Sequence, residues 1–464
     1  MVEGGVSPIA ARRHFKDCTL ELLETMKSII ISASSAGACR ILAIVLNLVG
    51  IPLALAKLGP SRFGLLLVIL SISSWIGFAN IGMGRVIANT VARRSSSSSR
   101  FTVEFVSLAT VLAAVINLLL FLVATGLFFL FLSFAPLEDV IAANYHEFAV
   151  TIVIMFFALS LWFFLSVFEG IDAGHHQLHR LYFFQLISYS LSLAILLLVF
   201  PTHPSITFAA YLLNLGFLLG SVFHAVDVVR RNRNLFSLNF GWRWRTIRLL
   251  TLSSLDFTVI SLGLGVIFQF ATGLFGFIDG PESVVELGIF MRLMQSYGSL
   301  VIAFTFPLSN LVAFRLKRRD VASVVRTVRL SGIMLLSGSI VGGAGFLILG
   351  VPILSFWLKS AIHIDRLFLV SGSLLIVLGA LHFFLAALMT GAADIRTASR
   401  IHILEAVAFL PLAFLLFRAL EQSGVLLAMD IVLGAGTLAM LGRLRKHSVL
   451  GRVFAVRSAY APIA

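Results

Sequence analysis

Long apolar stretches alternate with short polar segments along the whole chain. Twelve stretches are long enough to cross a hydrocarbon layer about 30 Å thick, because an α-helix rises about 1.5 Å per residue. Segments rich in glycine, proline, serine or charge separate them, such as residues 59–64, 95–99 and 201–205. The expected spans are 29–56, 64–88, 102–132, 148–170, 181–200, 206–229, 247–277, 285–314, 328–356, 367–390, 401–420 and 424–443. The pattern predicts an all-α polytopic membrane protein with twelve transmembrane helices.

Composition supports a membrane protein over a soluble domain with one anchor. The chain is 59% hydrophobic and 12% charged, and its mean hydropathy is +1.03, whereas soluble domains carry about 25% charged residues. Residues 1–28 show no cleavable signal peptide, and their apolar positions recur at helical spacing, which predicts an amphipathic helix on the membrane surface. Of the two cysteines, Cys18 lies in this segment and Cys39 in the first span, so no disulfide or cysteine metal site is expected.

The basic residues predict the orientation of the spans. Of the 35 Lys and Arg residues, 28 fall in the two termini and in the loops after spans 2, 4, 6, 8 and 10, and five fall on the opposite side. By the positive-inside rule, both termini are expected in the cytoplasm. The net charge of +14 therefore reflects topology, and no nucleic-acid partner is expected.

An internal repeat predicts two halves of six spans each. The segment GPSRFG at 59–64 and the segment GPESVVELG at 280–288 occupy matching places, and each is followed thirty residues later by a basic cluster. Because six is an even number, the halves enter the membrane from the same side and form a parallel repeat. The expected division is an N-terminal segment 1–28, a six-helix bundle 29–229, an interfacial linker 230–246, a second bundle 247–444 and a basic tail 445–464.

Several short motifs give the chain a family resemblance. The stretches IPLALAKLG (51–59), NIGMGRVIAN (80–89), ELGIFMRL (286–293) and RRDVASVVR (318–326) resemble those of Wzx-like polysaccharide flippases. That family is a branch of the multidrug/oligosaccharidyl-lipid/polysaccharide exporter superfamily. The family commonly has an acidic residue at the position of Asn80, so no proton-relay role is carried to that residue.

The resemblance implies a fold, an activity and partners. It implies two six-helix bundles in a V around a central cavity, in a bacterial inner membrane. It implies that undecaprenyl-diphosphate-linked oligosaccharide moves from the cytoplasmic to the periplasmic leaflet by alternating access. A polysaccharide polymerase and a chain-length regulator are the implied protein partners, and no cofactor is implied.

Two arginines lie inside expected spans, away from every loop. Arg40 lies near the middle of the first span, on a helical stripe of small and polar residues that includes Asn47. Arg292 lies in the eighth span, with Gln295 one turn later. A charge in a span usually faces protein or water, and a guanidinium suits bidentate binding of phosphate or carboxylate. We therefore expect Arg40, Asn47, Arg292 and Gln295 to line a substrate cavity.

Intramembrane carboxylates leave a second interpretation open. Asp256 in the seventh span and Asp430 in the twelfth would neutralise an arginine in a fixed ion pair or couple transport to a proton or cation. Glu104 and Glu405 lie near expected cytoplasmic ends and are interpreted as interfacial.

Three other functions are alternatives to a flippase for lipid-linked oligosaccharide. A multidrug extruder of the same superfamily should hold organic cations on acidic cavity residues, whereas the two clearest intramembrane charges here are arginines. A peptidoglycan-precursor flippase usually has two further helices. A membrane-embedded polysaccharide-processing enzyme needs a reactive cluster at one membrane face, and every expected outer loop is short. We therefore expect a transporter and not an enzyme. The chain also lacks a GK[ST] phosphate loop, so ATP hydrolysis within it is not expected.

Overall fold

The computed structural model describes residues 8–78, 83–93, 100–134, 139–175, 177–236, 244–317, 320–358, 364–392, 394–447 and 449–454. Every regular element in these ranges is a helix. The first half contains α1 (Pro8–Phe78), α2 (Met83–Arg93), α3 (Arg100–Phe134), α4 (Asp139–Ala143), α5 (Tyr145–Gly174), α6 (Leu178–Leu198), α7 (Ile206–Leu215), α8 (Leu218–Arg231) and η1 (Arg233–Leu235).

The second half repeats this plan. It contains α9 (Trp244–Gly265), the π-turn η2 (Val266–Phe270), α10 (Ala271–Ile278), η3 (Pro281–Val284), α11 (Val285–Lys317), α12 (Val321–Leu358), α13 (Arg366–Gly391), α14 (Ile395–Arg445) and α15 (Gly451–Phe454). The elements α9, η2 and α10 follow one another without a gap and together form the seventh expected span.

The helices account for all twelve expected spans. Within the described ranges, nine helices are long and apolar enough to cross a membrane, and the pair α7 and α8, bent by 51°, adds a tenth span. Two of the nine contain a non-helical residue, Gly59 in α1 and Glu421 in α14. Each break falls between two expected spans, so α1 and α14 supply two spans apiece. The prediction of a twelve-span all-α membrane protein is confirmed.

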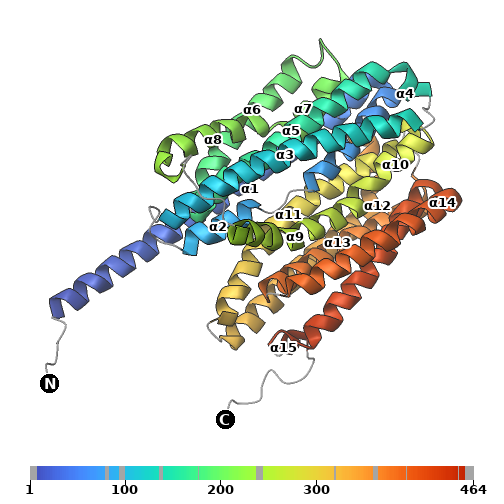
Figure 1. Cartoon of the computed structure of the whole chain (residues 1–464). Helices are drawn as coiled ribbons and strands as arrows, with labels where there is room; N and C mark the ends of the chain where they lie inside the picture. The colour runs from blue at the N-terminus through green and yellow to red at the C-terminus, as the bar shows by residue number, and fades with distance from the viewer. Residues whose placement is uncertain are drawn as a thin grey trace.

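The twelve spans form two bundles of six, which lie one above the other in Figure 1. In the N-terminal bundle, α5 packs against α1, α2 and α3, and in the C-terminal bundle α13 packs against α11, α12 and α14. These two helices are the fourth and tenth spans, so equivalent helices occupy the centre of each bundle. The bundles meet where α1 packs against α10, α11 and η3.

The contact between the bundles includes two equivalent glycine-proline turns. Gly59 has φ 76° and Gly280 has φ 91°, a backbone region that side chains disfavour strongly. The two turns touch, because Ser61 donates a hydrogen bond to Glu282 and a Cβ on Gly64 would lie 2.2 Å from the carbonyl oxygen of Pro281. We call this side of the molecule, defined by residues 59–64 and 280–284, the closed end.

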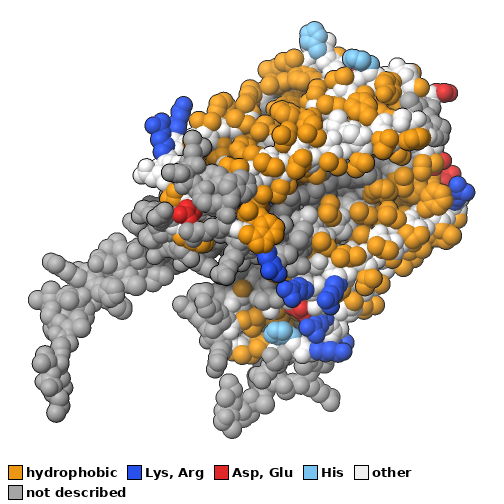
Figure 2. All heavy atoms as spheres, in the orientation of Figure 1, with side chains coloured by type: hydrophobic (Ala, Val, Ile, Leu, Met, Phe, Trp, Pro, Cys, Tyr) orange, Lys and Arg blue, Asp and Glu red, His pale blue; other side chains and the backbone are white. Residues whose placement is uncertain are grey.

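The opposite side carries the basic residues and is called the basic end. It is defined by Arg230 and Arg231 at the end of α8 and by Arg443 and Arg445 at the end of α14. Figure 2 shows a broad hydrophobic surface between the Lys and Arg side chains of this end and the acidic side chains near the closed end. In Figure 1 the bundles spread apart from the closed end toward α8 and α15. This is the V arrangement expected from the resemblance.

The predicted domain boundaries can be compared with the ends of the helices. The segment 1–28 is helical from Pro8, but it continues into the first span as part of α1. In the predicted linker, η1 and the start of α9 are described, whereas residues 237–243 lie outside the described ranges, as do 455–464 of the predicted tail. The boundaries themselves stay predictions.

Candidate substrate site between the two bundles

Arg40 reaches from the N-terminal bundle to the C-terminal bundle. Its Nη1 donates a hydrogen bond of 2.8 Å to the backbone carbonyl of Ser299 in α11. The side chain is half-buried, and the neighbouring Cys39 thiol donates to the carbonyl of Tyr182 in α6 at 2.9 Å. A neutral carbonyl satisfies one donor of the guanidinium and leaves its charge uncompensated.

Arg292 makes the reverse contact, from the C-terminal bundle to the N-terminal one. The side chain is 7% exposed. Its Nη1 donates to the side-chain oxygen of Gln295 at 3.0 Å and, at 3.4 Å, to that of Asn214 in α7. Its Nη2 is buried and has no hydrogen-bond partner among the described residues. Because a buried donor without a partner is costly, this nitrogen is the one best prepared to receive a ligand oxygen.

The other predicted cavity residues lie on the same two helices. Asn47 donates to the carbonyl of Ala43 in its own helix at 3.0 Å, and its side-chain oxygen is buried without a partner in the described part of the chain. Gln295 accepts the bond from Arg292 and is half-buried. Ser299 and Arg292 are seven residues apart on α11, so the two guanidinium contacts lie about 10 Å apart along that helix.

A fixed ion pair between these arginines and Asp430 is not formed. Asp430 is 4% exposed in the last part of α14, and neither of its carboxylate oxygens completes a hydrogen bond with a described residue. Ser371 of α13 is its polar neighbour. Among the described side chains, no carboxylate lies within salt-bridge distance of Arg40 or Arg292. The other predicted partner, Asp256, lies in α9, and its side chain is outside the described part of the chain.

The interface can therefore hold an anion by charge-assisted hydrogen bonds. Two guanidiniums, one from each bundle, face the contact between α1, α7 and α11 with donors left over. Such donors bind phosphate and carboxylate oxygens about twice as strongly as neutral donors do. Since each arginine contacts the opposite bundle, a ligand that takes over these donors would change how the bundles contact each other.

The sequence did not predict the cross-bundle partner of either arginine, and it misplaced one carboxylate. Ser299 contributes a backbone carbonyl, which carries no sequence signal, whereas Asn214 is a polar residue inside an expected span and was detectable. Glu405 was predicted to be interfacial, and this is wrong: the residue is 4% exposed, and its Oε2 lies 2.8 Å from His402 Nδ1. Helix α14 begins at Ile395, so Glu405 lies about 15 Å into it.

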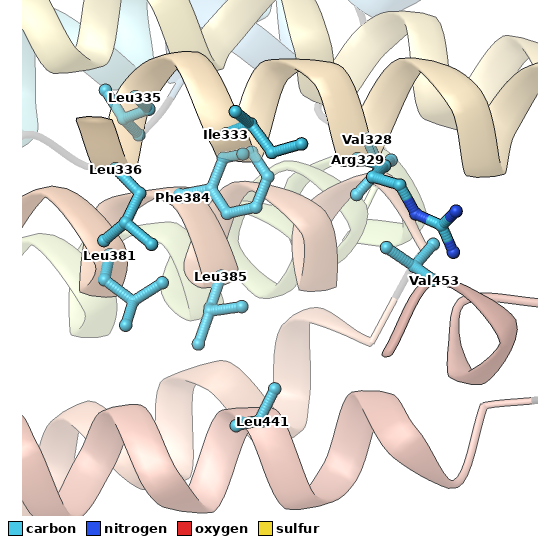
Figure 3. A pocket seen from close by; sticks show the side chains of 11 residues that line it. Val328, Arg329, Ile333, Leu335, Leu336, Leu381, Phe384, Leu385, Leu441 and Val453 are labelled. Carbon is cyan, nitrogen blue, oxygen red and sulfur yellow. The ribbon is translucent and has the colours of Figure 1, made fainter. Parts of the chain in front are cut away.

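A separate apolar recess lies within the C-terminal bundle. Its volume is about 230 Å³. Figure 3 shows it between α12, α13 and the end of α14, with Arg329 at its rim. Phe384, Leu385 and Leu441 line it. Its lining does not include the four predicted cavity residues, so the recess is distinct from the site at the bundle interface.

Comparisons with known proteins establish the fold. No family model and no curated protein matches the chain. Among solved structures, an inward-facing multidrug resistance MATE family transporter of the MOP superfamily matches with a TM-score of 0.69 at 14% identity, covering 93% of this chain and 100% of the other. The eukaryotic MATE transporter AtDTX14 matches with a TM-score of 0.65 at 13% identity, covering 93% and 98%.

A third structure is informative for its pocket. It is a MOP superfamily transporter from Pyrococcus furiosus whose binding pocket has reversed polarity, which suggests a different function for that protein. It matches with a TM-score of 0.68 at 14% identity, covering 93% of this chain and 97% of the other. At these identities the likeness concerns the fold, which is that of the two-bundle transporters of this superfamily.

Proposed function

We propose that this protein is a flippase for lipid-linked anionic oligosaccharides. In this proposal it moves an undecaprenyl-diphosphate-linked repeat unit from the cytoplasmic to the periplasmic leaflet by alternating access. The basic end is the cytoplasmic face, both chain termini lie on that side, and the membrane is a bacterial inner membrane. A polymerase and a chain-length regulator are the partners that would use the product.

The observation that carries the proposal is the pair of cross-bundle arginines. Arg40 and Arg292 each donate to a neutral oxygen of the opposite bundle, and no described carboxylate compensates either charge. A diphosphate or acidic sugar supplies the missing negative charge. The contact of the glycine-proline turns keeps the closed end sealed while the bundles spread toward the basic end, which supports loading from the cytoplasmic face.

A multidrug extruder is the competing function, and the likeness in fold to the MATE transporters favours it. An organic cation needs negative charge in the cavity, yet the two charged side chains described at the contact of α1, α7 and α11 are arginines. The Pyrococcus furiosus protein is relevant here, because its reversed pocket polarity is linked to a different function within this fold. The polarity of the interface in this chain supports the anionic substrate.

The test is transport by the full chain reconstituted in proteoliposomes. The probe is undecaprenyl diphosphate that carries one fluorescent sugar, and its appearance in the opposite leaflet is measured with a membrane-impermeant quencher. We expect Arg40→Ala and Arg292→Ala to lower the initial rate at least about tenfold, which corresponds to loss of one charge-assisted contact. Lysine at either position should restore part of the rate, because it keeps the charge but loses the bidentate fork.

Arg418→Ala is the matched control. Arg418 also lies on a membrane-spanning helix, but it is exposed and its guanidinium lies 4.7 Å from the Phe414 ring, so its loss should leave the rate unchanged. Ethidium transport is measured on the same vesicles. Normal flipping by both alanine variants, or ethidium transport without flipping, would contradict the proposal.

A further inference from the structure

Three side chains that commonly ligate metals converge in the core of the C-terminal bundle. His382 comes from α13, and His402 and Glu405 come from α14. Their ligand atoms all lie within 4.8 Å of one another, and their exposures are 0%, 0% and 4%. His402 and Glu405 are three residues apart, so they share one helix face, and His382 approaches them from the facing helix. Metal sites in helical bundles are commonly built this way.

The distances in this cluster are close to those of a coordination sphere. Glu405 Oε2 lies 2.8 Å from His402 Nδ1 and 3.6 Å from His382 Nε2. A zinc ion binds nitrogen and carboxylate oxygen at about 2.0–2.2 Å in a tetrahedral arrangement, which places neighbouring ligand atoms roughly 3.3 Å apart. One ion therefore fits between the three atoms with small side-chain rotations.

A neighbouring threonine prepares His382 for this role. His382 Nδ1 lies 3.2 Å from Thr437 Oγ1 in the last part of α14. When Nδ1 donates its hydrogen to that hydroxyl, Nε2 carries the lone pair and points toward Glu405. A histidine ligand is usually oriented by such a second hydrogen bond. The cluster thus joins the tenth, eleventh and twelfth spans.

Several polar atoms of the cluster have no partner within the described part of the chain. They are His382 Nε2, His402 Nε2 and Glu405 Oε1. A metal ion would bind His382 Nε2 directly and Glu405 Oε1 through bidentate binding by the carboxylate. The carboxylate also fills the space beside Gly436, since a Cβ there would lie 1.4 Å from Glu405 Oε1. Glu405 is therefore held in the core beside Gly436, where the last part of α14 has no side chain.

We propose that His382, His402 and Glu405 bind one divalent transition-metal ion, of which Zn²⁺ is the best fit. Two imidazole nitrogens and a carboxylate favour such an ion, whereas sodium, magnesium and calcium prefer sites made of oxygen. The ion holds α13 against both parts of α14 and stiffens the C-terminal bundle. The inference is independent of the transported substrate.

The test uses the full-length protein without a polyhistidine tag, purified in detergent. The protein is stripped with a chelator, incubated with ZnCl₂ and passed through a gel-filtration column, and its metal content is then measured by mass spectrometry. We expect one zinc ion per chain. Glu405→Gln, which keeps the shape of the side chain, and His382→Ala should each lower the bound zinc at least about tenfold.

His203→Ala is the matched control, because His203 is exposed in the loop before α7 and its loss should leave one zinc ion bound. Cobalt serves as a spectroscopic probe: the wild-type protein should show the visible bands of low-symmetry Co²⁺, and Glu405→Gln should lose them. Zinc should also raise the unfolding temperature of the wild-type protein but not that of the variant. The proposal fails if the wild-type protein retains no zinc, or if Glu405→Gln retains as much as wild type.

Discussion

The two bundles share one arrangement of helices but treat charge at their basic ends differently. In the N-terminal bundle, Asp172 is 0% exposed at the end of α5 and contacts both His224 and Arg231 at 2.9 Å. In the C-terminal bundle, Asp394 lies in the short link after α13 and pairs with Arg443 at 2.7 Å, but these side chains are 26% and 55% exposed. The same connection between equivalent spans is thus buried in one bundle and solvated in the other.

The cores of the two bundles also differ, at the positions of His382, His402 and Glu405. His382 lies nine residues before Gly391, and the residue nine before Gly170 is Leu161. Counting from the starts of α14 and α6, the counterparts of His402 and Glu405 are Gln185 and Ser188. The C-terminal bundle therefore buries a cluster of ionisable groups deep between three spans, at positions where the N-terminal bundle has Leu161, Gln185 and Ser188. Repetition of the fold fixes where helices pack, and it leaves open where each bundle buries its ionisable groups.

Loss of the buried carboxylate should give the largest effect. Asp172→Ala leaves His224 and Arg231 without their shared partner, and breaking a buried ion pair from one side costs about 3–5 kcal/mol. The free energy of unfolding is measured by denaturant titration in mixed micelles. Asp227→Ala is the control, because Asp227 also pairs with Arg231 at 2.9 Å but its side chain is 29% exposed. Equal losses for the two variants would contradict the comparison.

Both glycine-proline turns should lose stability when a side chain is added. Gly59→Ala and Gly280→Ala each force a side chain into a region of positive φ, which costs about 1–3 kcal/mol. At Gly59 the cost is purely conformational, since an added Cβ would meet nothing within 4 Å. The same titration measures both variants. Gly126→Ala in α3, where φ is helical and the space is also open, should instead stabilise the protein slightly. A loss of stability in only one of the two variants would contradict the equivalence of the two turns.

The exposed counterpart of Asp172 should give the smallest effect. Burial alone would raise the pKa of Asp394, but hydrogen bonds from Thr397 and Arg443 outweigh it and lower that pKa. A carboxyl with a lowered pKa stabilises the folded state above its unfolded pKa of about 3.9, and this contribution disappears as pH falls below that value. At pH 7 we expect Asp394→Ala to cost about 0–1 kcal/mol, less in high salt, and to cost nothing in strong acid. A loss as large as that of Asp172→Ala would contradict the difference in burial.

The fold was predictable because lipid restricts backbone structure. A chain in hydrocarbon must satisfy its own backbone groups, so each long apolar run becomes a helix, and helices lie in the described part of all twelve runs. The bend between α7 and α8 was not predictable from the same pattern. There the carbonyl of Gly216 accepts from Ser188 at 2.6 Å and from Ser192 at 3.2 Å. These hydroxyls lie on α6, so the bend depends on a neighbouring helix.

The candidate site was predictable in part for a related reason. A lone charge in an apolar run is conspicuous, which is why Arg40 and Arg292 were identified from the sequence. The contacts they make were not, because Ser299 contributes a carbonyl and Asn214 lies in the other half of the chain. The cluster around Glu405 escaped because α14 begins six residues before the expected span, and this shift moves the carboxylate from the membrane surface into the core.

The contact between the two turns has a consequence for symmetry. Ser61 and Glu282 both follow a glycine-proline pair by one residue, and they hydrogen-bond to each other. In a symmetric dimer of six-span chains, a residue on the two-fold axis would meet its own copy, serine against serine or glutamate against glutamate. Joining the two halves in one polypeptide removes that restriction, so one half provides the hydroxyl donor and the other the carboxylate acceptor. A complementary pair on the axis is available only to the covalently joined protein.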